Sequence, residues 1–353
     1  MQIRLIVVAL CLFAMQIFAL AQQRECGTVI SPEQREAELR DRALQKPGEV
    51  HVPPLLPFRI PLTIHICRMN DGTGGFTLGQ LDSAMRQVNA LYASTGIQFF
   101  QYGDIIYIDN TYFFNVKDVQ TDRDFLRSQR VVANTVNVYF TNLDSLCGQG
   151  TFPGDVVQGV LMSNDCAGTV TNTSSFAHEL GHFLNLYHTH ETAFGMECPS
   201  GSNCTTTGDL LCDTPADPDL TDRVTECTYN GGVNAPPGCE GTYAPQVNNL
   251  MSYATKNCRS MFTAGQIDRM LTTLSGSRRY LLTLERYVAQ GWTGTQAGFP
   301  EFPFSTIAAA LASAGPGMVI FASAGVYPEN VTVLQNVQLR LWNQTGELVI
   351  GKK

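Results

Sequence analysis

Charged side chains are scarce in this 353-residue sequence: 15% of the residues are charged, whereas 44% are hydrophobic. Basic residues are the minority, since 23 Lys and Arg stand against 31 Asp and Glu, and the formal net charge is -8. No basic run and no interleaving of basic with aromatic residues offers a surface for phosphate groups. We therefore expect a folded chain with a sizeable core and no nucleic-acid partner.

Long hydrophobic runs are absent beyond the N-terminus. There, Arg4 precedes an apolar run from Leu5 to Leu20, which is shorter than the roughly 18 residues typical of a membrane-spanning helix. The small-x-small triplet Ala19, Leu20, Ala21 predicts a cleavage site after Ala21, so residues 1–21 are interpreted as a secretory signal peptide. We expect a secreted, extracellular protein without stable membrane association after signal cleavage.

Cysteine is present in a pattern typical of secreted proteins. Of the 11 cysteines, Cys11 lies in the predicted signal peptide, and the ten that remain are an even number. Disulfides are therefore the default expectation. Six of them crowd into one stretch rich in Gly, Pro, Asp and Thr, namely Cys198, Cys204, Cys212, Cys227, Cys239 and Cys258. This stretch has too few periodic apolar residues to form a hydrophobic core of its own, so we expect disulfides to stabilise it.

The pattern of the first half predicts alternating strands and helices. Residues 22–57 are charged and helical, then proline-rich, which is typical of a propeptide and linker. From Ile60, IPLTIHIC alternates as a strand, and Thr77 with Gln80 forms a capping box for a following helix. That helix carries an apolar stripe of Leu81, Met85, Val88 and Tyr92. GIQFF, VNVYF and VVQGVLM are then expected to be strands, and this order favours an α/β or α+β sandwich.

Histidine is concentrated in residues 178–191, HELGHFLNLYHTHE, which hold four of the chain's six histidines. On a helix, His178 and His182 lie one turn apart on the same face, which is the geometry that two imidazoles need to bind one zinc ion. Glu179 then lies beside the metal without being one of its ligands. The segment therefore predicts a zinc site with an adjacent carboxylate.

A third zinc ligand requires the chain to turn after the helix. Asn185 can make this turn, because asparagine tolerates the left-handed backbone conformation. His188 follows three residues later and can return to the metal, so we predict it as the third ligand. His190 is the alternative third ligand, and otherwise an exposed or supporting histidine.

Three neutral imidazoles leave the fourth position of zinc open for a water molecule. The ion lowers the pKa of that water from about 15.7 to about 7. Glu179 can take the proton of the water and pass it to a leaving amine. The residues in this spacing therefore predict hydrolysis.

The motif HExxHxxxxxH resembles the metzincin zinc signature. With its flanks, with the later NNLMSYATKNCRSMFTAGQIDRM and with CGT after residue 25, the chain resembles the pappalysin (cytophagalysin) family over roughly residues 24 to 285. The resemblance implies an α+β metzincin-like protease domain at residues 58–288, with a mixed sheet, an active-site helix, a Met-turn and a C-terminal helix. One departure is Asn185, where most metzincins have glycine.

The same resemblance implies roles for two residues of NLMSY. Met251 would be the methionine of the turn beneath the zinc site, and Tyr253 the tyrosine that hydrogen-bonds the transition-state oxyanion. Without the resemblance, a single methionine is usually a packing residue of the hydrophobic core, and a tyrosine in a loop is usually a half-buried packing residue. After them, Thr263 and Gln266 form a capping box for a final helix that could pack against the zinc helix. Its apolar face comprises Ile267, Met270, Leu271 and Leu274.

Cys26 lies in the expected propeptide. A thiolate is a strong zinc ligand, so Cys26 could occupy the open metal position and keep the enzyme latent, as a zymogen. Similar family members suggest the same role. The alternative is a fifth disulfide, which the even cysteine count favours.

Acidic residues gather in GDLLCDTPADPDLTD, and their hard oxygen atoms would suit calcium, although no EF-hand spacing is present. The aspartates are Asp209, Asp213, Asp217, Asp219 and Asp222. A solvated acidic loop is the alternative. Calcium in related proteases favours the metal-binding interpretation.

Residues 289–353 change character: an Ala-rich helix and a G-P-G turn precede short strands separated by turns. The stretch resembles the start of a right-handed parallel β-helix. Such solenoids need about three or more repeats to bury a continuous core, and this stretch offers about two. We expect either that the chain continues in a longer protein or that this part docks on something else.

Two hypotheses for the function follow. The first is a secreted zinc-dependent endopeptidase that hydrolyses extracellular proteins or peptides, with Glu179 as general base. The second is a non-enzymatic adhesion or glycan-binding protein in which the β-helix carries the function and the zinc domain is vestigial. The intact set of His178, Glu179, His182 and His188 favours the enzyme, because a vestigial site has no chemical reason to keep the base.

Overall fold

The computed structural model describes residues 24–44, 58–117, 119–300, 302–314, 318–333, 337–342 and 346–351. The predicted signal peptide, residues 1–21, lies outside the described residues, as does most of the predicted linker before residue 58. Within the part of the chain that is described, no helix is long and apolar enough to span a membrane.

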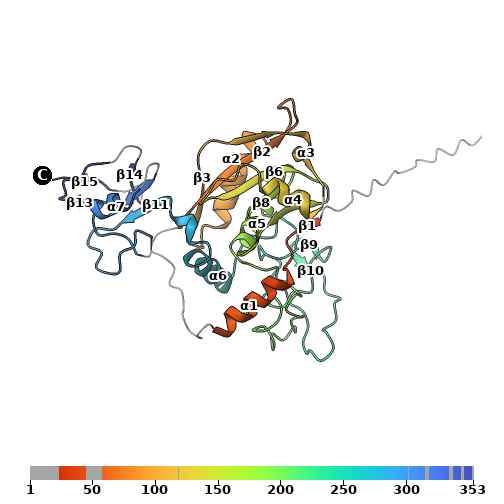
Figure 1. Cartoon of the computed structure of the whole chain (residues 1–353). Helices are drawn as coiled ribbons and strands as arrows, with labels where there is room; N and C mark the ends of the chain where they lie inside the picture. The colour runs from red at the N-terminus through yellow and green to blue at the C-terminus, as the bar shows by residue number, and fades with distance from the viewer. Residues whose placement is uncertain are drawn as a thin grey trace, which may run out of the picture.

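A mixed sheet of eight strands forms the centre of the molecule (Figure 1). Six strands follow one another across it, in the order β1 (Arg24–Cys26), β7 (Leu146–Gly150), β8 (Val160–Ser163), β6 (Val136–Leu143), β2 (Phe58–Arg68) and β3 (Ile97–Gln101). In addition, β4 (Ile106–Asp109) pairs with β2, and β5 (Asn115–Val116) pairs with β6. Only the β7–β8 pair is antiparallel among the described ladders of this sheet. The prediction of a mixed α+β fold is therefore confirmed.

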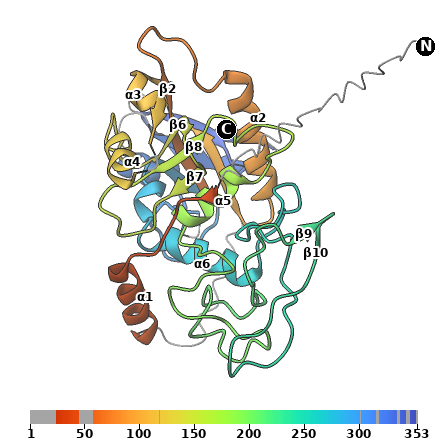
Figure 2. The same ribbon diagram turned by 90° about the vertical axis from the view of Figure 1, so that its right-hand side faces the viewer.

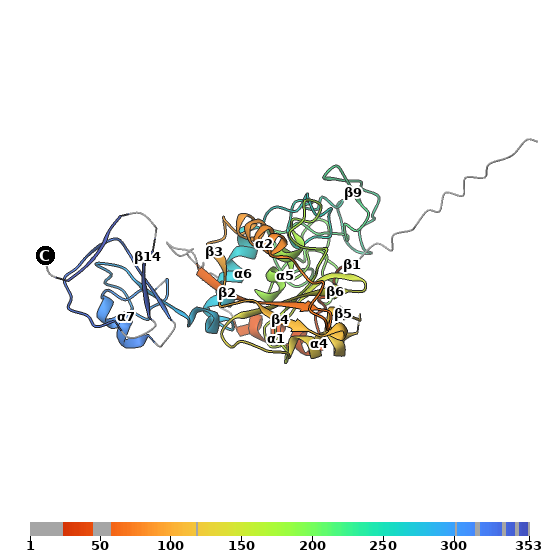
Figure 3. The ribbon, with the colours of Figure 1, turned by 90° about the horizontal axis from the view of Figure 1, so that it is seen from above.

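Helices cover both faces of this sheet, so the alternating side chains of its strands enter two different cores. On one face, Ile60, Leu62, Ile64 and Ile66 of β2 are fully buried against α2 (Leu78–Leu91) and α5 (Ser175–Phe183). On the other face, Cys67 of β2 joins a second apolar cluster with α3 (Thr111–Phe114) and α4 (Gln120–Arg127). Figure 3 shows α2 and α5 on one side of the sheet and α4 on the other.

Both predicted capping boxes are present. Thr77 and Gln80 exchange side-chain and backbone hydrogen bonds at the start of α2, and Thr263 and Gln266 do the same at the start of α6 (Ala264–Ser275). The apolar face of α6 joins the core that contains Leu180 of α5. These two helix starts were predictable because every contact in a capping box is local.

The expected strand VVQGVLM is only half correct. Strand β8 begins only at Val160. The preceding Gly159 has φ +149°, and its backbone N and O atoms hydrogen-bond with the Thr151 side chain and not with a neighbouring strand. The hydroxyl of Thr151 accepts from Gly159 N at 3.0 Å and lies 3.2 Å from Gly159 O. A side chain from the neighbouring loop therefore replaces the expected strand partner.

Loops form most of the region between α5 and α6, with one short hairpin of β9 (Val224–Thr225) and β10 (Thr228–Tyr229) (Figure 2). Three disulfides hold this region, as expected: Cys198–Cys239, Cys204–Cys212 and Cys227–Cys258. A fourth, Cys147–Cys166, joins the end of the sheet to the loop before α5. Cys26 and Cys67 are unpaired and buried, so the structure contains no fifth disulfide between described residues.

The described C-terminal residues form parallel strand pairs. After a 3-10 turn at η1 (Arg279–Leu282), the elements are β11 (Glu285–Val288), α7 (Ile307–Ser313), β12 (Val319–Ala322), β13 (Gly325–Tyr327), β14 (Gln338–Leu341) and β15 (Leu348–Ile350). Strands β11, β12 and β14 form one parallel sheet, and β13 pairs in parallel with β15. The blue segment extends to one side of the main body in Figure 1. The β-helix remains a prediction.

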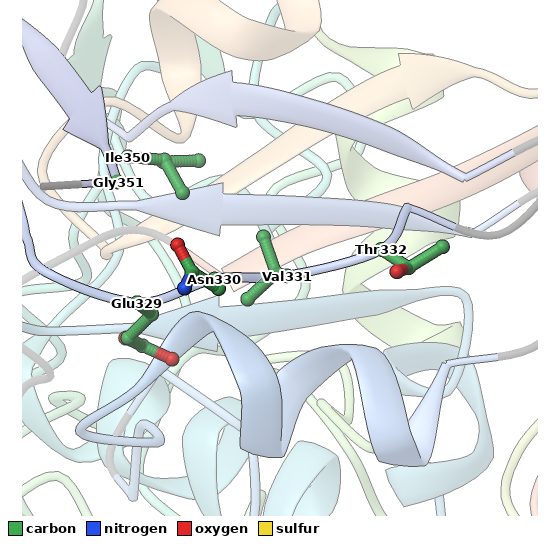
Figure 4. A pocket seen from close by; sticks show the side chains of 6 residues that line it. All are labelled: Glu329, Asn330, Val331, Thr332, Ile350 and Gly351. Atoms are coloured by element: carbon green, nitrogen blue, oxygen red, sulfur yellow. The ribbon is translucent and has the colours of Figure 1, made fainter.

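A cavity of about 320 Å³ opens on this C-terminal segment (Figure 4). It is lined by Glu329, Asn330, Val331, Thr332, Ile350 and Gly351. The Glu329 carboxylate accepts hydrogen bonds from the first amides of α7, those of Ile307 and Ala308, at 3.0 and 2.8 Å. None of the predicted site residues lines this cavity.

Candidate metal centre

Helix α5 brings the first two predicted ligands together. His178 and His182 lie one turn apart, are buried, and their Nε2 atoms are 3.1 Å apart. In each ring Nδ1 lies 2.7 Å from a backbone oxygen, that of Leu250 for His178 and that of Leu186 for His182. A carbonyl can only accept, so both Nδ1 atoms carry the proton, and both Nε2 atoms of the neutral rings present lone pairs to one another.

The chain turns at Asn185, which has φ +72°, the left-handed conformation expected for it. Directly after the turn, Leu186 N donates to the Gly181 carbonyl at 2.9 Å. This returns the chain toward the helix, and His188 Nε2 comes to lie 3.0 Å from His182 Nε2. His190 stacks on the His188 ring with centroids 4.9 Å apart and is not part of the group of potential metal ligands.

Cys26 completes this group. One ligand atom from each of Cys26, His178, His182 and His188 lies within 4.8 Å of the others, the only such group of three or more potential ligands among the described residues. Tetrahedral zinc with Zn–N bonds of about 2.0–2.1 Å separates two nitrogen ligands by roughly 3.3 Å, close to the observed 3.0 and 3.1 Å. Facing lone pairs repel unless a cation lies between them, so the donor set fits a zinc ion.

Burial lowers the pKa values of the three candidate histidine ligands, which favours the neutral rings that bind a cation. It lowers the pKa of His182 to about 3 and lowers the pKa values of His178 and His188 well below the usual range, with neighbouring histidines adding to the effect at both. The rings are therefore neutral at physiological pH, as metal binding requires. Burial, and after it the Glu179 carboxylate, raises the pKa of the Cys26 thiol. A divalent cation beside the sulfur would lower the pKa of the thiol and so oppose the effects of burial and of the Glu179 charge.

Glu179 is held against the edge of the sheet. Its Oε2 accepts from Gly150 N at 2.8 Å and lies 3.3 Å from the Cys26 sulfur. The two glycines of β7 make this approach possible, because a Cβ at Gly148 would lie 2.6 Å from the Glu179 Cγ and one at Gly150 would lie 2.2 Å from the Glu179 carbonyl oxygen. Sequence reasoning missed both. The sequence feature that could have revealed these two glycines is their alternation in CGQG, which leaves one face of the strand without side chains.

Met251 lies directly under the helix. It is fully buried, and a Cβ at Gly181 would lie 2.6 Å from its sulfur. The turn that carries it is fixed by the Asn249 side chain, whose oxygen accepts from Met251 N at 2.9 Å. The preceding carbonyl, that of Leu250, is the one that orients His178. The turn thus packs against the helix that carries His178 and His182, the first two candidate ligands.

Tyr253 packs against the histidines after the Asn185 turn. Its ring centroid is 4.8 Å from that of His188 and 4.4 Å from that of His190. The hydroxyl donates to the backbone carbonyl of Cys26 at 3.2 Å. Tyr253 therefore already binds a peptide carbonyl beside the candidate metal centre.

Two buried arginines fix the ends of α5, and neither was singled out from the sequence. Arg259 donates to Ser174 Oγ and to the Ser252 carbonyl, both at 3.0 Å, which joins the start of the helix to the Met251 turn. Arg278 donates to the Phe183 carbonyl at 3.0 Å and to the Thr151 carbonyl at 3.1 Å, which joins the helix end to the chain after β7. Their partners are distant in sequence, so no local pattern points to them.

The N-terminal segment occupies the sheet edge beside the centre. Strand β1 pairs in parallel with β7, with Cys26 opposite Gly148, and Gly27 N donates to the Gly148 carbonyl at 2.9 Å. The Thr28 hydroxyl donates to the Gly150 carbonyl at 2.9 Å. Figure 2 shows this red segment running past β7 to α1 (Pro32–Leu44). The segment therefore covers the backbone groups of β7 that lie nearest Glu179.

The acidic stretch does not gather its aspartates into one group. Asp213 Oδ2 accepts from Gly265 N at 2.6 Å at the start of α6, and Asp217 accepts from the Thr189 hydroxyl at 2.6 Å. Asp209 accepts from Thr214, Asp219 accepts from Thr221, and Asp222 has a positive φ. No cluster of three carboxylates occurs among the described residues. Calcium binding therefore remains a prediction.

Comparison with known proteins finds a family that matches part of the chain. The family model described as pregnancy-associated plasma protein-A, peptidase M43, matches residues 144–275. These residues form a peptidase M43 domain. The match contains the three histidines, Glu179, Met251 and Tyr253, and the M43 domain is that of a zinc metalloprotease family.

Relatives of the M43 domain include extracellular enzymes. The chain is 28% identical to an extracellular metalloprotease of Colletotrichum graminicola over 271 residues, 70% of this chain and 89% of that protein. It is 30% identical to pappalysin-1 of Mus musculus over 147 residues, 38% of this chain but 9% of that much longer protein. Among solved structures, promirolysin of Tannerella forsythia is 19% identical, covers 73% of this chain and 97% of its own, and has a TM-score of 0.51. This last likeness shows the fold alone.

Proposed function

We propose that the protein is a secreted zinc-dependent endopeptidase that hydrolyses peptide bonds of extracellular proteins or peptides. The observation that carries this proposal is the close approach of the three Nε2 atoms beside the Glu179 carboxylate, with the lone pairs of His178 and His182 facing one another. Membership of residues 144–275 in a metalloprotease family supports it. The extracellular relatives support secretion, which the predicted signal peptide also favours.

His178, His182 and His188 would hold the zinc ion. When bound, zinc polarises the substrate carbonyl and lowers the pKa of a water molecule to about 7. Glu179 takes the proton of the attacking water and delivers it to the nitrogen of the leaving amine. Its geometry suits this work, since Gly150 N and the bare face of β7 hold the carboxylate beside the ligands.

Tyr253 would stabilise the oxygen that develops negative charge. A hydroxyl that already donates to a peptide carbonyl, that of Cys26, can donate to the scissile carbonyl of a substrate in the same place. Met251 and the Asn185 turn act through the ligands: the first packs under the helix and the second brings His188 back to it.

Residues 22–57 would keep the enzyme latent. Cys26 lies within the ligand group, where its sulfur would take the place of the catalytic water. The alternative of a fifth disulfide is not supported, because Cys26 has no cysteine partner among the residues that the structure describes. Activation would then require removal of the segment that contains β1 and α1.

A non-enzymatic adhesion protein with a vestigial zinc domain is the weaker hypothesis. Such a protein would have no need for a carboxylate held by two glycines beside three imidazoles. The cavity on the described C-terminal residues is lined by none of the residues predicted to act in either function.

Digestion of a peptide library tests the proposed function. The whole chain is expressed with a recognition sequence for a specific protease inserted between residues 44 and 58, and is cut there after folding. We expect the cut, zinc-loaded protein to cleave internal peptide bonds, a chelator to abolish cleavage, and added zinc to restore it. A cut protein that retains zinc and leaves the whole library intact would contradict the proposal.

A further inference from the structure

An apolar cluster lies next to the candidate metal centre and has no part in the proposed catalytic mechanism. Its buried members come from three segments: Ile30 from between β1 and α1, Phe152 from the loop after β7, and Tyr187, Phe194 and Leu210 from the loop after α5. The rings of Phe152 and Tyr187 are 5.2 Å apart, and those of Tyr187 and Phe194 are 5.3 Å apart. This cluster is separate from the main core of the sheet and α5.

The cluster borders the metal ligands directly. The Phe152 ring meets the His182 ring edge-on at a centroid distance of 5.5 Å. Tyr187 immediately precedes His188, and Phe152 follows Gly150, the last residue of β7, by two residues, so the cluster begins just beyond the end of this strand. A peptide bound along the edge of β7 with its scissile bond at the metal would pass over the cluster.

One member of the cluster, Ile30, comes from the segment that covers the site. Ile30 is 8% exposed, whereas the preceding Val29 is 78% exposed. The segment therefore buries Ile30 and leaves Val29 in contact with solvent. Ile30 follows the Cys26 ligand by four residues, and the intervening Thr28 binds the Gly150 backbone. The segment therefore binds the edge with its backbone and the cluster with a single aliphatic side chain.

Removal of the segment opens this position. Beyond Ile30, the covering segment is held by Gln34, whose Nε2 donates to Asp155 Oδ1 at 2.5 Å, and by an ion pair of Glu38 with Arg269 at 3.6 Å. All these contacts belong to β1, α1 and the residues between them, so cleavage before residue 58 releases them together. Phe152, Tyr187, Phe194 and Leu210 would then lose the side chain that covers them.

We propose that Phe152, Tyr187, Phe194 and Leu210 form a substrate subsite for a large aliphatic or aromatic side chain, and that Ile30 fills it in the unprocessed chain. The inference rests on the proposed peptidase function. Because four extended residues span about 13 Å, the selected side chain lies about three or four residues from the scissile bond. The four members are apolar or aromatic, and the Arg269 guanidinium lies 4.9 Å from the centroid of the Tyr187 ring. A basic side chain at this position would therefore lose its hydration without gaining a partner.

Cleavage profiling of the cut protein tests the subsite. We expect Ile, Leu, Val or Phe to be enriched at one position about three or four residues from the scissile bond, with kcat/KM about tenfold or more above that of the alanine peptide. Phe194→Ala should reduce this preference, and Phe194→Leu should keep the preference for aliphatic residues while weakening that for Phe. Met196→Ala is the matched control, since Met196 is close in sequence but 55% exposed, and it should change nothing.

A binding measurement provides a readout besides activity. In the cut protein, the dissociation constant of the N-terminal fragment is measured for wild type, Ile30→Ala and Val29→Ala. We expect Ile30→Ala to weaken retention about tenfold or more and Val29→Ala to leave it unchanged.

The outcomes separate failure of the subsite from failure of the enzyme. An active enzyme without apolar preference at any such position, or with the same preference in Phe194→Ala, overturns the subsite and leaves the peptidase function standing. Equal retention of the Ile30→Ala and Val29→Ala fragments overturns the role of Ile30. A zinc-loaded protein without any cleavage contradicts the peptidase function itself.

Discussion

Replacing Cys26 by alanine in the uncut chain should release part of the peptidase activity. The substitution deletes the sulfur that lies within the ligand group. It leaves the pairing of β1 with β7 and the Thr28 contact with Gly150 in place. We therefore expect weakened latency with the fold and the other ligands intact.

The size of the effect follows from the number of ligands. Four ligands bind a structural zinc ion with about 10–16 kcal/mol, so one ligand contributes on average about 3 kcal/mol. Since about 1.4 kcal/mol corresponds to a factor of ten, Cys26→Ala should raise the fraction of molecules with an accessible metal about 100-fold. The remaining contacts of Thr28, Ile30 and Glu38 keep the activity below that of the cut protein.

The assay compares initial rates of peptide cleavage by the uncut wild type, the uncut Cys26→Ala protein and the cut wild type. Cys67→Ala is the matched control, because Cys67 is the other buried unpaired cysteine and lies in the opposite core. Activity that rises equally in both variants would trace the effect to general destabilisation. Full latency of the uncut Cys26→Ala protein, with zinc bound, would refute the role of the sulfur.

Two further substitutions test individual roles. Tyr253→Phe removes one donor to the oxyanion and should lower kcat about 100- to 1,000-fold with unchanged zinc content; a rate within a few-fold of wild type would show that Tyr253 only packs. His188→Ala should strongly reduce zinc content by metal analysis, whereas His190→Ala, which removes a ring outside the ligand group, should retain the metal; the reverse result would make His190 the third ligand.

The part of the site that could be predicted is the local part. The spacing of His178 and His182, the left-handed turn at Asn185 and the return of His188 all lie within one short segment, so sequence spacing determines their geometry. Both helix capping boxes were predictable for the same reason. Local hydrogen bonding and helix periodicity suffice for such features.

The missed part depends on contacts between distant segments. Gly148 and Gly150 matter because Glu179 of another element packs on them, and His178 is oriented by Leu250, which is 72 positions later. Strand β7 itself escaped prediction, because LCGQG lacks the β-branched alternation of a strand and gains its extended shape from pairing with β8 and β1. Ile30 has no local signal at all, since its partners come from two distant segments, the loop after β7 and the long loop after α5.

The most direct test of the mechanism is the activity of Glu179→Gln at equal zinc content, measured in the cut protein. Glutamine keeps the size of the side chain and is not expected to disturb the three imidazoles, but it cannot take a proton from water. Glu191→Gln, in the loop after the ligands, is the control. We predict full zinc content in both variants, near wild-type kcat/KM for Glu191→Gln, and a loss of about 100- to 10,000-fold for Glu179→Gln. A Glu179→Gln protein that binds zinc and cleaves peptides at nearly the wild-type rate would contradict the account.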